Sequence, residues 1–449
     1  MIKIDLNEIA AAVEGRPTSA LPAGYVGNVV TDSRLSDSGS VFFALTGEKF
    51  DGHDFIKGLE GRVLAAVVER EVDSSVPQIV VDSTYKAIGR LGAYIRTKSA
   101  VTVVGVTGSV GKTSVKELTA AVLSQRYSVL KTEKNHNNEL GLPMTLFRLS
   151  EENEVAVLEM GISYFGEMTR ISRIARPDIA IFSNIENVHT ENLIDRDGVL
   201  RAKTELVANM RGDTLILNGE DDKLAGYSVP AGKKALYYGI DGDMFSSAED
   251  IVYHGMESTE FTLCMGREKI RVDLPASGRH MVMNSLAAAA AGKVLGLTLE
   301  EIKAGLESYV PVQGRMSRIE YRGAVIIDDC YNASPTSVKA SLGVLGKASG
   351  RRIALLGDML ELGERTVALH REVGEFAANG CAEILVTVGE LGREIADSAR
   401  EHGLNSAFHL ERDEAAKFLK NELKAGDTLL VKASRGMKLE EIIKLIMEG

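Results

Sequence analysis

One short segment, Thr107-Gly-Ser-Val-Gly-Lys-Thr113, constrains the fold of this chain more than any other. It follows an apolar run over residues 101–106 that predicts a buried strand. It precedes an amphipathic pattern that predicts a helix to about Gln125. A strand, a glycine-rich loop and a helix in this order bind phosphate, because backbone N–H groups and the helix N-terminus face the phosphate oxygens. We therefore expect an α/β fold with a nucleotide site at residues 107–113.

The residues of this loop have expected roles. We expect the glycine-rich backbone to surround the phosphates of ATP or GTP, Lys112 to reach the outer phosphates, and the Thr113 hydroxyl to face Mg²⁺. The expected nucleotide contacts of the loop are Thr107, Gly108, Ser109, Val110, Gly111, Lys112 and Thr113. The usual G-x-x-x-x-G-K-[ST] spacing is not kept, because Val106 stands in place of its first glycine. The alternative interpretation is an ordinary glycine-rich turn.

Composition limits the class of protein. The 449 residues are 45% hydrophobic and 26% charged, which is typical of a globular chain of two or three domains. The formal net charge of −11 disfavours nucleic acid as a partner, since an acidic surface repels a phosphate backbone. The three cysteines are scattered, the first residues are too acidic for an export signal, and no apolar run approaches the ~20 residues of a membrane span. We expect a cytoplasmic protein without membrane insertion.

Strand and helix patterns alternate in two long stretches, which predicts parallel sheets with helices on both faces. The expected domains are 1–99, a small α/β domain; 100–311, a central P-loop ATPase domain; and 312–449, a Rossmann-like α/β domain. Pro311 beside Gly314 predicts the linker between the last two. Polar and apolar residues alternate over 251–274, which predicts an antiparallel hairpin added at a sheet edge.

Three more candidate residues follow in the middle domain. Glu159 ends the apolar run 155–159, at the position where open α/β sheets place catalytic groups. His189 lies just past the run 178–183, and Lys203 lies in a helical pattern. Each has a plain alternative interpretation: a solvated glutamate at a strand end, a packed or surface histidine, and a surface lysine on a helix.

Together these motifs resemble those of the ATP-dependent Mur ligase superfamily. The phosphate loop is followed, in the family order, by Glu159-Met-Gly, His189-Thr-Glu and Arg201-Ala-Lys-Thr-Glu-Leu. Asp328-Asp-Cys-Tyr-Asn-Ala-Ser-Pro and Leu356-Gly-Asp-Met-Leu-Glu-Leu-Gly resemble the signatures of the branch that adds D-Ala-D-Ala rather than the branch that adds the third residue. The resemblance covers essentially the whole chain.

The resemblance implies an amide ligase of cytoplasmic peptidoglycan synthesis, and so a part in cell wall biogenesis, cell shape and cell division. Such an enzyme joins D-alanyl-D-alanine to UDP-N-acetylmuramoyl-tripeptide through an acyl phosphate and releases ADP and phosphate. Both steps concentrate negative charge, so we expect catalysis by positioning and charge neutralisation. The resemblance also implies a monomer whose outer domains, which bind the nucleotide sugar and the dipeptide, close over the central ATPase.

The resemblance further implies a metal and catalytic set. It implies two Mg²⁺ ions, one held by Thr113 and Glu159 and the other by His189 and Lys203. Because Mg²⁺ would repel an ammonium group, we expect Lys203 to react with CO₂ and become a carbamate, as the matching lysine does in related ligases. The expected catalytic residues are Lys112, Glu159, His189, Lys203 and Arg315. The resemblance places Arg315 at the γ-phosphate.

Further nucleotide contacts are implied near the adenine and ribose, at Asn284, Asp328, Tyr331 and Asn332. Asn284 matches the second Asn of a His-Asn-x-x-Asn pattern, but Met281 replaces the first, so the adenine contacts at that position stay open. In the signature Lys432-Ala-Ser-Arg435, Ala433 replaces a glycine, which can change how closely the backbone approaches a ligand. The alternative for each of these residues is a capping or turn role.

For the nucleotide sugar and its peptide, the resemblance implies two turns in the first domain and an asparagine-rich loop in the second. The expected substrate contacts are Asp32, Ser33, Arg34, Gly47, Asp51, His53, Asn135, Asn137 and Asn138. The Arg34 guanidinium has the geometry to pair with a phosphate bidentately. The alternatives are an exposed turn and a polar loop rich in side-chain caps.

Three other functions stay open on the sequence alone. A ligase of the same superfamily that adds a single amino acid or glutamate would share most motifs, and a regulatory protein could keep the ATPase domain without ligating. A P-loop kinase or switch would not need the first and last domains. The sequence leaves undetermined the third residue of the tripeptide (lysine or diaminopimelate), the dipeptide selectivity and the oligomeric state.

Overall fold

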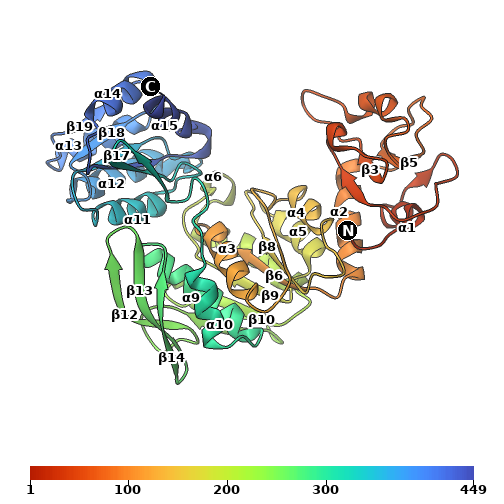
Figure 1. The fold of residues 1–449 in the computed structure, drawn as a ribbon, viewed down its shortest axis with the longest axis horizontal. Helices are drawn as coiled ribbons and strands as arrows, with labels where there is room; N and C mark the ends of the chain where they lie inside the picture. The colour runs from red at the N-terminus through yellow and green to blue at the C-terminus, as the bar shows by residue number, and fades with distance from the viewer. Residues whose placement is uncertain (449) are drawn as a thin grey trace.

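The structure is a computed structural model that describes residues 1–448, and it follows the α/β pattern (Figure 1). We call residues 1–99, 100–311 and 312–448 the N-terminal, central and C-terminal units. In Figure 1 the N-terminal and C-terminal units lie at opposite ends of the view, with the central unit between them. No helix of the described residues is long and apolar enough to cross a membrane.

The N-terminal unit is built on a five-stranded sheet in the order β1-β5-β4-β3-β2, parallel except for β1. Its strands are β1 (Arg16–Pro17), β2 (Asn28–Val30), β3 (Ser40–Phe43), β4 (Ala65–Val68) and β5 (Gln78–Val80). Its helices are α1 (Leu6–Ala12) and α2 (Thr84–Lys98), with 3₁₀ segments at Ser33–Leu35 and Gly52–Leu59. A capping box of Asp5 and Glu8 starts α1, since each side chain accepts the backbone N–H of the other residue.

The central unit has a six-stranded parallel sheet in the order β11-β10-β9-β6-β8-β7. Its strands are β6 (Thr102–Thr107), β7 (Val129–Lys131), β8 (Val155–Glu159), β9 (Ile179–Phe182), β10 (Thr214–Asn218) and β11 (Lys234–Tyr238). Its helices are α3 (Lys112–Leu123), α4 (Gly141–Leu146), α5 (Glu167–Ala175), α6 (Thr190–Leu193), α7 (Arg196–Thr204), α8 (Asp222–Ala225), α9 (Arg279–Val294) and α10 (Leu299–Glu307), with a 3₁₀ segment at Glu205–Asn209. The apolar runs predicted β6, β8 and β9, whereas the short β7 and the partly exposed β11 lacked that signal.

The hairpin predicted at a sheet edge is antiparallel, but its position was wrong. Strands β12 (Ser247–His254), β13 (Ser258–Met265) and β14 (Glu268–Leu274) form a separate three-stranded sheet, linked to β11 by the single bridge Tyr238↔Ser246. Phe261 and Val272 on its apolar face pack into the same core as α9 and α10. The alternation therefore reflects a sheet that covers helices, which the sequence pattern does not distinguish from an added edge.

The C-terminal unit has a six-stranded sheet in the order β15-β16-β20-β17-β18-β19, parallel except for β15. Its strands are β15 (Ser317–Tyr321), β16 (Ala324–Asp328), β17 (Arg352–Leu356), β18 (Ile384–Thr387), β19 (Ala407–His409) and β20 (Thr428–Lys432). Its helices are α11 (Pro335–Leu345), α12 (Thr366–Ala378), α13 (Gly392–Glu401), α14 (Arg412–Glu422) and α15 (Glu440–Met447), with 3₁₀ segments at Gly363–Arg365 and Arg435–Met437. Helices on both faces enclose two hydrophobic clusters of this unit.

Candidate functional site

The site begins where three neighbouring strands end. Strands β8, β6 and β9 lie side by side and parallel, so their carboxyl ends meet at one edge of the central sheet. The phosphate loop follows β6, and Glu159 is the last residue of β8. Directly after β9, Asn184 accepts the N–H of Val110 at 2.8 Å and donates to its carbonyl at 3.1 Å, while the Ser183 hydroxyl donates to that carbonyl at 2.6 Å. The loop is thus held in shape from the neighbouring strand.

Glycine is required at two positions of the loop. Gly108 has φ = 140° and Gly111 has φ = 84°, conformations that other residues rarely adopt. A Cβ atom on Gly108 would lie 2.0 Å from the Ser183 hydroxyl oxygen. Gly111 directly precedes α3, so the turn directs the N-terminus of that helix toward the loop.

Lys112 lies across the phosphate loop. Its Nζ donates to the carbonyls of Gly108 and Ser109 at 2.9 and 3.0 Å. Burial lowers the pKa of Lys112 to about 8, although the Glu159 carboxylate favours the charged form. This lysine therefore titrates near neutral pH, and an anionic ligand in the loop would favour its charged form.

Glu159 is 3% exposed, and its two oxygens have different surroundings. Oε1 accepts a hydrogen bond from Asn137 at 2.8 Å, whereas Oε2 is buried without a hydrogen-bond partner among the described residues. A buried carboxylate oxygen without a partner is costly, so this atom fits a cation ligand. No group of three or more His, Cys, Asp or Glu residues in positions 1–448 could hold a metal. A cation here would therefore depend on Glu159, hydroxyl groups and ligand oxygens.

The Thr113 hydroxyl lies at the same edge and already has a partner from another unit. It accepts a hydrogen bond from Arg315 of the C-terminal unit at 3.2 Å. The Arg315 guanidinium lies 4.1 Å from the ring centroid of Tyr331, and its Nε is buried without a hydrogen-bond partner among residues 1–448. Arg315 thus connects the phosphate loop to the C-terminal unit.

His189 makes a second contact between these units. Its Nδ1 lies 2.5 Å from Oε2 of Glu361, and both residues have positive φ, 53° and 64°. Burial lowers the pKa of His189, opposed by Glu361 and assisted by Lys112 and Lys203, which favours a neutral ring able to bind a metal. Strain at both residues is consistent with a functional position.

Lys203, on α7, is 1% exposed, and its ammonium group has no hydrogen bond or ion pair with any of residues 1–448. Burial and the nearby Lys112 hold the pKa of Lys203 well below its usual range. A buried lysine without a counter-ion is neutral over a wide pH range, and a neutral amine is a nucleophile. This environment does not match the alternative of a surface lysine.

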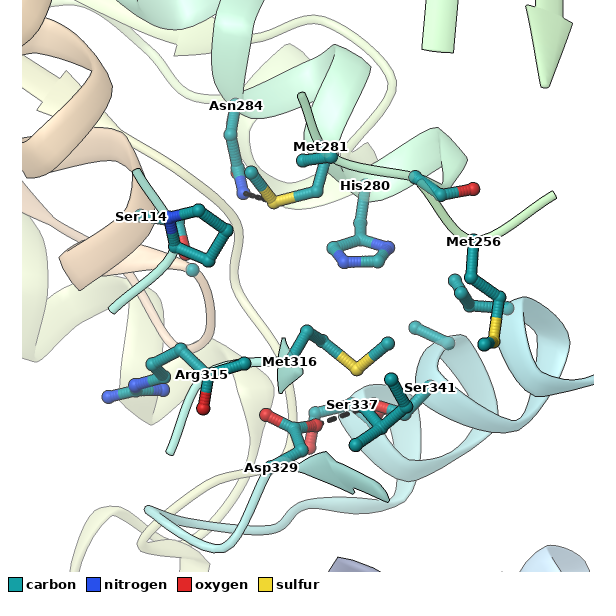
Figure 2. Close-up of a pocket in the computed structure, with 18 of the residues that line it drawn as sticks. Ser114, Met256, His280, Met281, Asn284, Arg315, Met316, Asp329, Ser337 and Ser341 are labelled. Atoms are coloured by element: carbon teal, nitrogen blue, oxygen red, sulfur yellow. Dashed lines mark hydrogen bonds between the residues drawn. The ribbon is translucent and has the colours of Figure 1, made fainter. Parts of the chain in front are cut away.

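Two neighbouring cavities lie between the central and C-terminal units, and Gly111 and Arg315 line both of them. The phosphate cavity, about 470 Å³, is lined by Lys112, Glu159 and His189 of the central unit and by Tyr331, Asn332, Glu361, Lys432 and Arg435 of the C-terminal unit. The apolar cavity, about 490 Å³, is lined by Asn284, His280 and Met281 of α9 and by Met316, Asp329 and Ser341 of the C-terminal unit. Figure 2 shows the α9 residues on one side of the apolar cavity and Asp329 and Ser341 on the other. Five residues line both cavities: Val110, Gly111, Arg315, Ser337 and Lys432.

The adjacent aspartates at the start of the C-terminal signature have different positions. The Asp328 carboxylate accepts the N–H of Cys330 at 3.1 Å and lines neither cavity. Asp329 lines the apolar cavity, where its Oδ2 accepts from Lys432 at 2.5 Å and from Ser341 at 2.7 Å. Asp329, rather than Asp328, is therefore the aspartate that lines a cavity, and the nucleotide contact of Asp328 stays a prediction.

Of the three predicted residues of the asparagine-rich loop, two line a cavity and one does not. Asn137 and Asn138 line the phosphate cavity, and Asn138 also accepts the N–H of Gly141 at 2.8 Å at the start of α4. Asn135 is exposed and lines neither cavity. Asn138 therefore both caps α4 and lines the phosphate cavity, and its substrate contact stays a prediction.

The predicted substrate residues of the N-terminal unit lie apart from both cavities, in the segments that follow β2 and β3. Arg34 is exposed and pairs with Asp32 at 2.6 Å, which lowers the pKa of Asp32 to about 2. The remaining predicted residues, Ser33 and Gly47, belong to the same two turns.

His53 makes its hydrogen bonds to neighbouring residues of the N-terminal unit. Its Nδ1 lies 2.6 Å from Asp51, and its Nε2 accepts the N–H of Glu69 at 2.9 Å. Asp51 also pairs with Arg70 at 2.7 Å, and these partners hold the pKa of Asp51 below its usual range. Because both ring nitrogens of His53 are used within the fold, this residue orients the turn.

Reasoning from the sequence missed several site residues, among them Ser183, Asn184 and Tyr164. Ser183 and Asn184 fix the phosphate loop, and Tyr164 lines the phosphate cavity. The first two follow the apolar run of β9, so their place at a strand end was a usable signal. Tyr164 lies in a segment without such a signal.

Two family models match the chain, the Mur ligase middle domain over residues 106–292 and the "Mur ligase, glutamate ligase domain" over residues 314–435. Among curated proteins, the UDP-N-acetylmuramoyl-tripeptide--D-alanyl-D-alanine ligase of Bacillus subtilis is 36% identical, covering 100% of this chain and 99% of the relative. The ligase of the same name from Escherichia coli is 35% identical with the same coverage.

Solved structures agree with these relatives. A MurF crystal structure from Acinetobacter baumannii matches with a TM-score of 0.91 at 32% identity, covering 100% of this chain and 99% of the other. The structure of the Thermotoga maritima MurF ligase in complex with ADP matches with a TM-score of 0.84 at 30% identity, covering 94% and 97%.

Proposed function

The chain belongs to the UDP-N-acetylmuramoyl-tripeptide--D-alanyl-D-alanine ligases of the Mur ligase family, and from this premise we propose how its residues divide the reaction. It is an ATP-dependent ligase of peptidoglycan synthesis that joins D-alanyl-D-alanine to UDP-N-acetylmuramoyl-tripeptide. The observation that carries the mechanism is the phosphate cavity, to which two units contribute charged and polar groups around one phosphate loop. A single-unit kinase or switch would not need the groups that the C-terminal unit supplies.

The phosphate loop and two cationic side chains, Lys112 and Arg315, act on the transferring phosphoryl group. We propose that the backbone of residues 108–111 and Lys112 hold the β and γ phosphates of ATP. Arg315 leaves the Thr113 hydroxyl to neutralise charge on the γ-phosphate as it passes to the tripeptide carboxylate. The dipeptide amine then displaces phosphate from the acyl phosphate, because a phosphorylated carboxyl is a better electrophile than a carboxylate. Closure of the C-terminal unit excludes water, which would hydrolyse the acyl phosphate.

Glu159 and Thr113 are the residues that would hold Mg²⁺ at the loop, and His189 with Lys203 would hold a second. Bound Mg²⁺ would supply charge neutralisation and alignment of the phosphates. The buried, unpartnered Oε2 of Glu159 supports the first site. Thr113 becomes available when Arg315 moves away, so binding of ATP and release of this hydrogen bond are coupled.

Lys203 fits the second site only after its charge is changed. We propose that its amine reacts with CO₂ to form a carbamate, as its burial and lowered pKa support. The amine nitrogen forms the new C–N bond and loses a proton, and the carbamate carries a negative charge. Carbon-13 NMR of the enzyme in labelled bicarbonate should show a carbamate signal that Lys203→Ala lacks. Full activity of Lys203→Ala in bicarbonate-free buffer would contradict the proposal.

Each remaining substrate, and the base of ATP, is assigned to one part of the molecule. We propose that the N-terminal unit binds the UDP-sugar through the turns that carry Asp32–Arg34 and Gly47–His53, with Arg34 exchanging Asp32 for a phosphate. The asparagines of the 135–138 loop face the peptide, and the dipeptide binds on the C-terminal unit. The nucleotide base contacts Asn284 in the apolar cavity, and Tyr331 and Asn332, which line the neighbouring phosphate cavity, lie near the ribose and the base.

A panel of amines tests the ligation. The enzyme is mixed with ATP, UDP-N-acetylmuramoyl-tripeptide and, separately, D-Ala-D-Ala, D-Ala or glutamate, and phosphate release and product mass are measured. D-Ala-D-Ala alone should stimulate phosphate release and add its mass less water to the tripeptide. Stimulation by a single amino acid only would favour another Mur ligase. Nucleotide binding without any amide product would favour a regulatory protein.

We also propose that the enzyme acts as a monomer in the cytoplasm. Light scattering after size-exclusion chromatography should give the mass of one chain, and a stable dimer that carries all the activity would contradict this.

A further inference from the structure

The antiparallel sheet β12–β14 belongs to the central unit, but the turn between β12 and β13 contacts the C-terminal unit. In Figure 1 this turn lies beside α11. We call residues 253–257 the arm tip. The Tyr253 ring centroid lies 3.1 Å from Lys347 Nζ, and Glu257 pairs with Arg318 at 3.0 Å. Met256 packs against a hydrophobic cluster of the C-terminal unit. The arm tip is thus a cross-unit contact separate from the linker at residues 310–314.

The arm tip is also part of the wall of the apolar cavity. Met256 and Glu257 line that cavity together with His280 and Asn284. The Ser277 hydroxyl donates to the carbonyl of Gly255 at 2.7 Å, which ties the tip to the segment leading into α9. A shift of the arm tip would therefore change the shape of the cavity.

The two units are also close together beside this wall. A Cβ on Gly278 would lie 2.9 Å from Val344 Cγ2 on α11, and Gly278 has φ = 111°. Lys347 follows α11 by two residues. The cation–π contact therefore holds the end of the same helix that borders the cavity through Ser337, Ser341 and Val344.

The apolar cavity has the right position for the base of the nucleotide, and this step rests on the proposed function. Val110, Gly111, Arg315, Ser337 and Lys432 line both cavities, so a nucleotide with its phosphates in the loop would extend its base into the apolar cavity. Met256, Met281 and Met316 suit contact with the face of an aromatic ring.

We propose that the arm tip is a positioning element for ATP: the Tyr253–Lys347 contact holds α11 at the separation that closes the apolar cavity over the nucleotide base. Neither residue lines the cavity, so both act through their neighbours, Tyr253 through Met256 and Lys347 through Val344. Loss of the contact weakens ATP binding and leaves the chemistry at the phosphate cavity intact.

Matched pairs of full-length variants test this proposal. Tyr253→Leu and Lys347→Met remove the cation–π contact, whereas Tyr253→Phe and Lys347→Arg keep a ring and a cation. The first pair should raise the KM for ATP about three- to tenfold, the range expected for a partly exposed to desolvated cation–π contact. The kcat and the KM for UDP-N-acetylmuramoyl-tripeptide should stay within about twofold of wild type. The double variant Tyr253→Leu/Lys347→Met should be no worse than either single variant, because both remove one contact.

The outcomes separate this inference from the function on which it rests. If the wild type forms no amide product with D-Ala-D-Ala, the proposed function fails. If the wild type is active but the KM for ATP is unchanged in both single variants, the arm-tip proposal is overturned. It is also overturned if Tyr253→Phe is as impaired as Tyr253→Leu, or if kcat falls together with the melting temperature, since either result indicates a merely structural role.

Discussion

The two outer units are joined to the central unit in different ways. On the N-terminal side, α2 places Ile88, Leu91 and Ile95 into a hydrophobic core that also contains residues of α4 and α5. On the C-terminal side, the contacts include single polar pairs, such as His189 with Glu361 and Arg315 with Thr113, besides the smaller apolar contact of Met256. An apolar interface of this kind is stable, whereas exposed or partly exposed polar pairs are easily exchanged for ligand contacts. We therefore expect the N-terminal joint to be the more rigid of the two and the C-terminal joint to be the one that moves.

Each joint also contains a buried cation, and the two differ in kind. Arg96 at the N-terminal joint donates to the carbonyls of Ala175, Val101 and Arg176 and pairs with Asp178 at 2.9 Å. Burial lowers its pKa only to about 10, so it stays charged at neutral pH. Lys112 at the C-terminal joint contacts only carbonyl oxygens and has a pKa of about 8. A satisfied arginine fixes a structure, whereas a lysine without a carboxylate contact is ready for an anionic ligand.

The largest expected effect is at the N-terminal joint. Arg96→Met should lower the free energy of unfolding by about 3–5 kcal/mol, because it leaves buried carbonyls and part of Asp178 without a donor. Urea denaturation followed by circular dichroism measures this. The control is Arg211→Met, which removes the more exposed partner of Asp178 and should cost less than about 1 kcal/mol. Equal losses in the two variants would contradict a special role for Arg96.

At the C-terminal joint the expected effect is on activity instead. Arg315→Ala should lower kcat about 10²- to 10³-fold, the loss typical when one charge-stabilising donor is removed. The melting temperature should hardly change, because the hydrogen bond to Thr113 is a single contact at an opening interface. Arg365→Ala, an exposed arginine of the same unit, is the control and should be fully active. A folded, fully active Arg315→Ala enzyme would remove this residue from the mechanism.

A smaller change tests how closely α2 packs. A Cβ on Gly92 would lie 3.0 Å from the Pro143 Cβ and 3.2 Å from Ile174 Cγ2, so Gly92→Ala should cost about 1–3 kcal/mol by overpacking. Gly343→Ala on α11 is the opposite control, because nothing lies within 4 Å of a Cβ there. It should stabilise its helix by up to about 1 kcal/mol. Stability gains in both variants would show that the N-terminal joint is looser than described.

The smallest expected effect is an uptake of protons when ATP binds. The pKa of Lys112 is lowered from its usual value of 10.5 to about 8, so at a pH between these two values Lys112 is largely neutral in the free enzyme. Phosphate groups raise the pKa of a neighbouring lysine, so ATP binding near pH 9 should take up as much as about one proton. Titration calorimetry in buffers of different ionisation enthalpy measures this uptake. Lys112→Met should abolish it, and an unchanged uptake in that variant would assign the proton to another group.

Much of the fold follows from patterns in the sequence. Buried runs predicted strands β6, β8 and β9, and the glycine loop between β6 and α3 lies where its chemistry requires. The short β7 and the antiparallel β15 were not predicted, because a three-residue strand and an edge strand have weak hydrophobic patterns. The sheet β12–β14 was predicted as antiparallel. The alternation of polar and apolar residues in its strands does not indicate that its apolar face packs against helices.

The sequence by itself determined which residues can do chemistry: the loop that binds phosphate, the carboxylate at the end of β8, and the motifs that identify the family. Only the tertiary structure decided which of them meet. It brings Arg315 to Thr113 and Glu361 to His189 across two units, faces Asp329 rather than Asp328 into a cavity, and uses both nitrogens of His53 within the fold. The physical reason is that local patterns set backbone conformation over a few residues, whereas contacts between units depend on how whole sheets and helices pack.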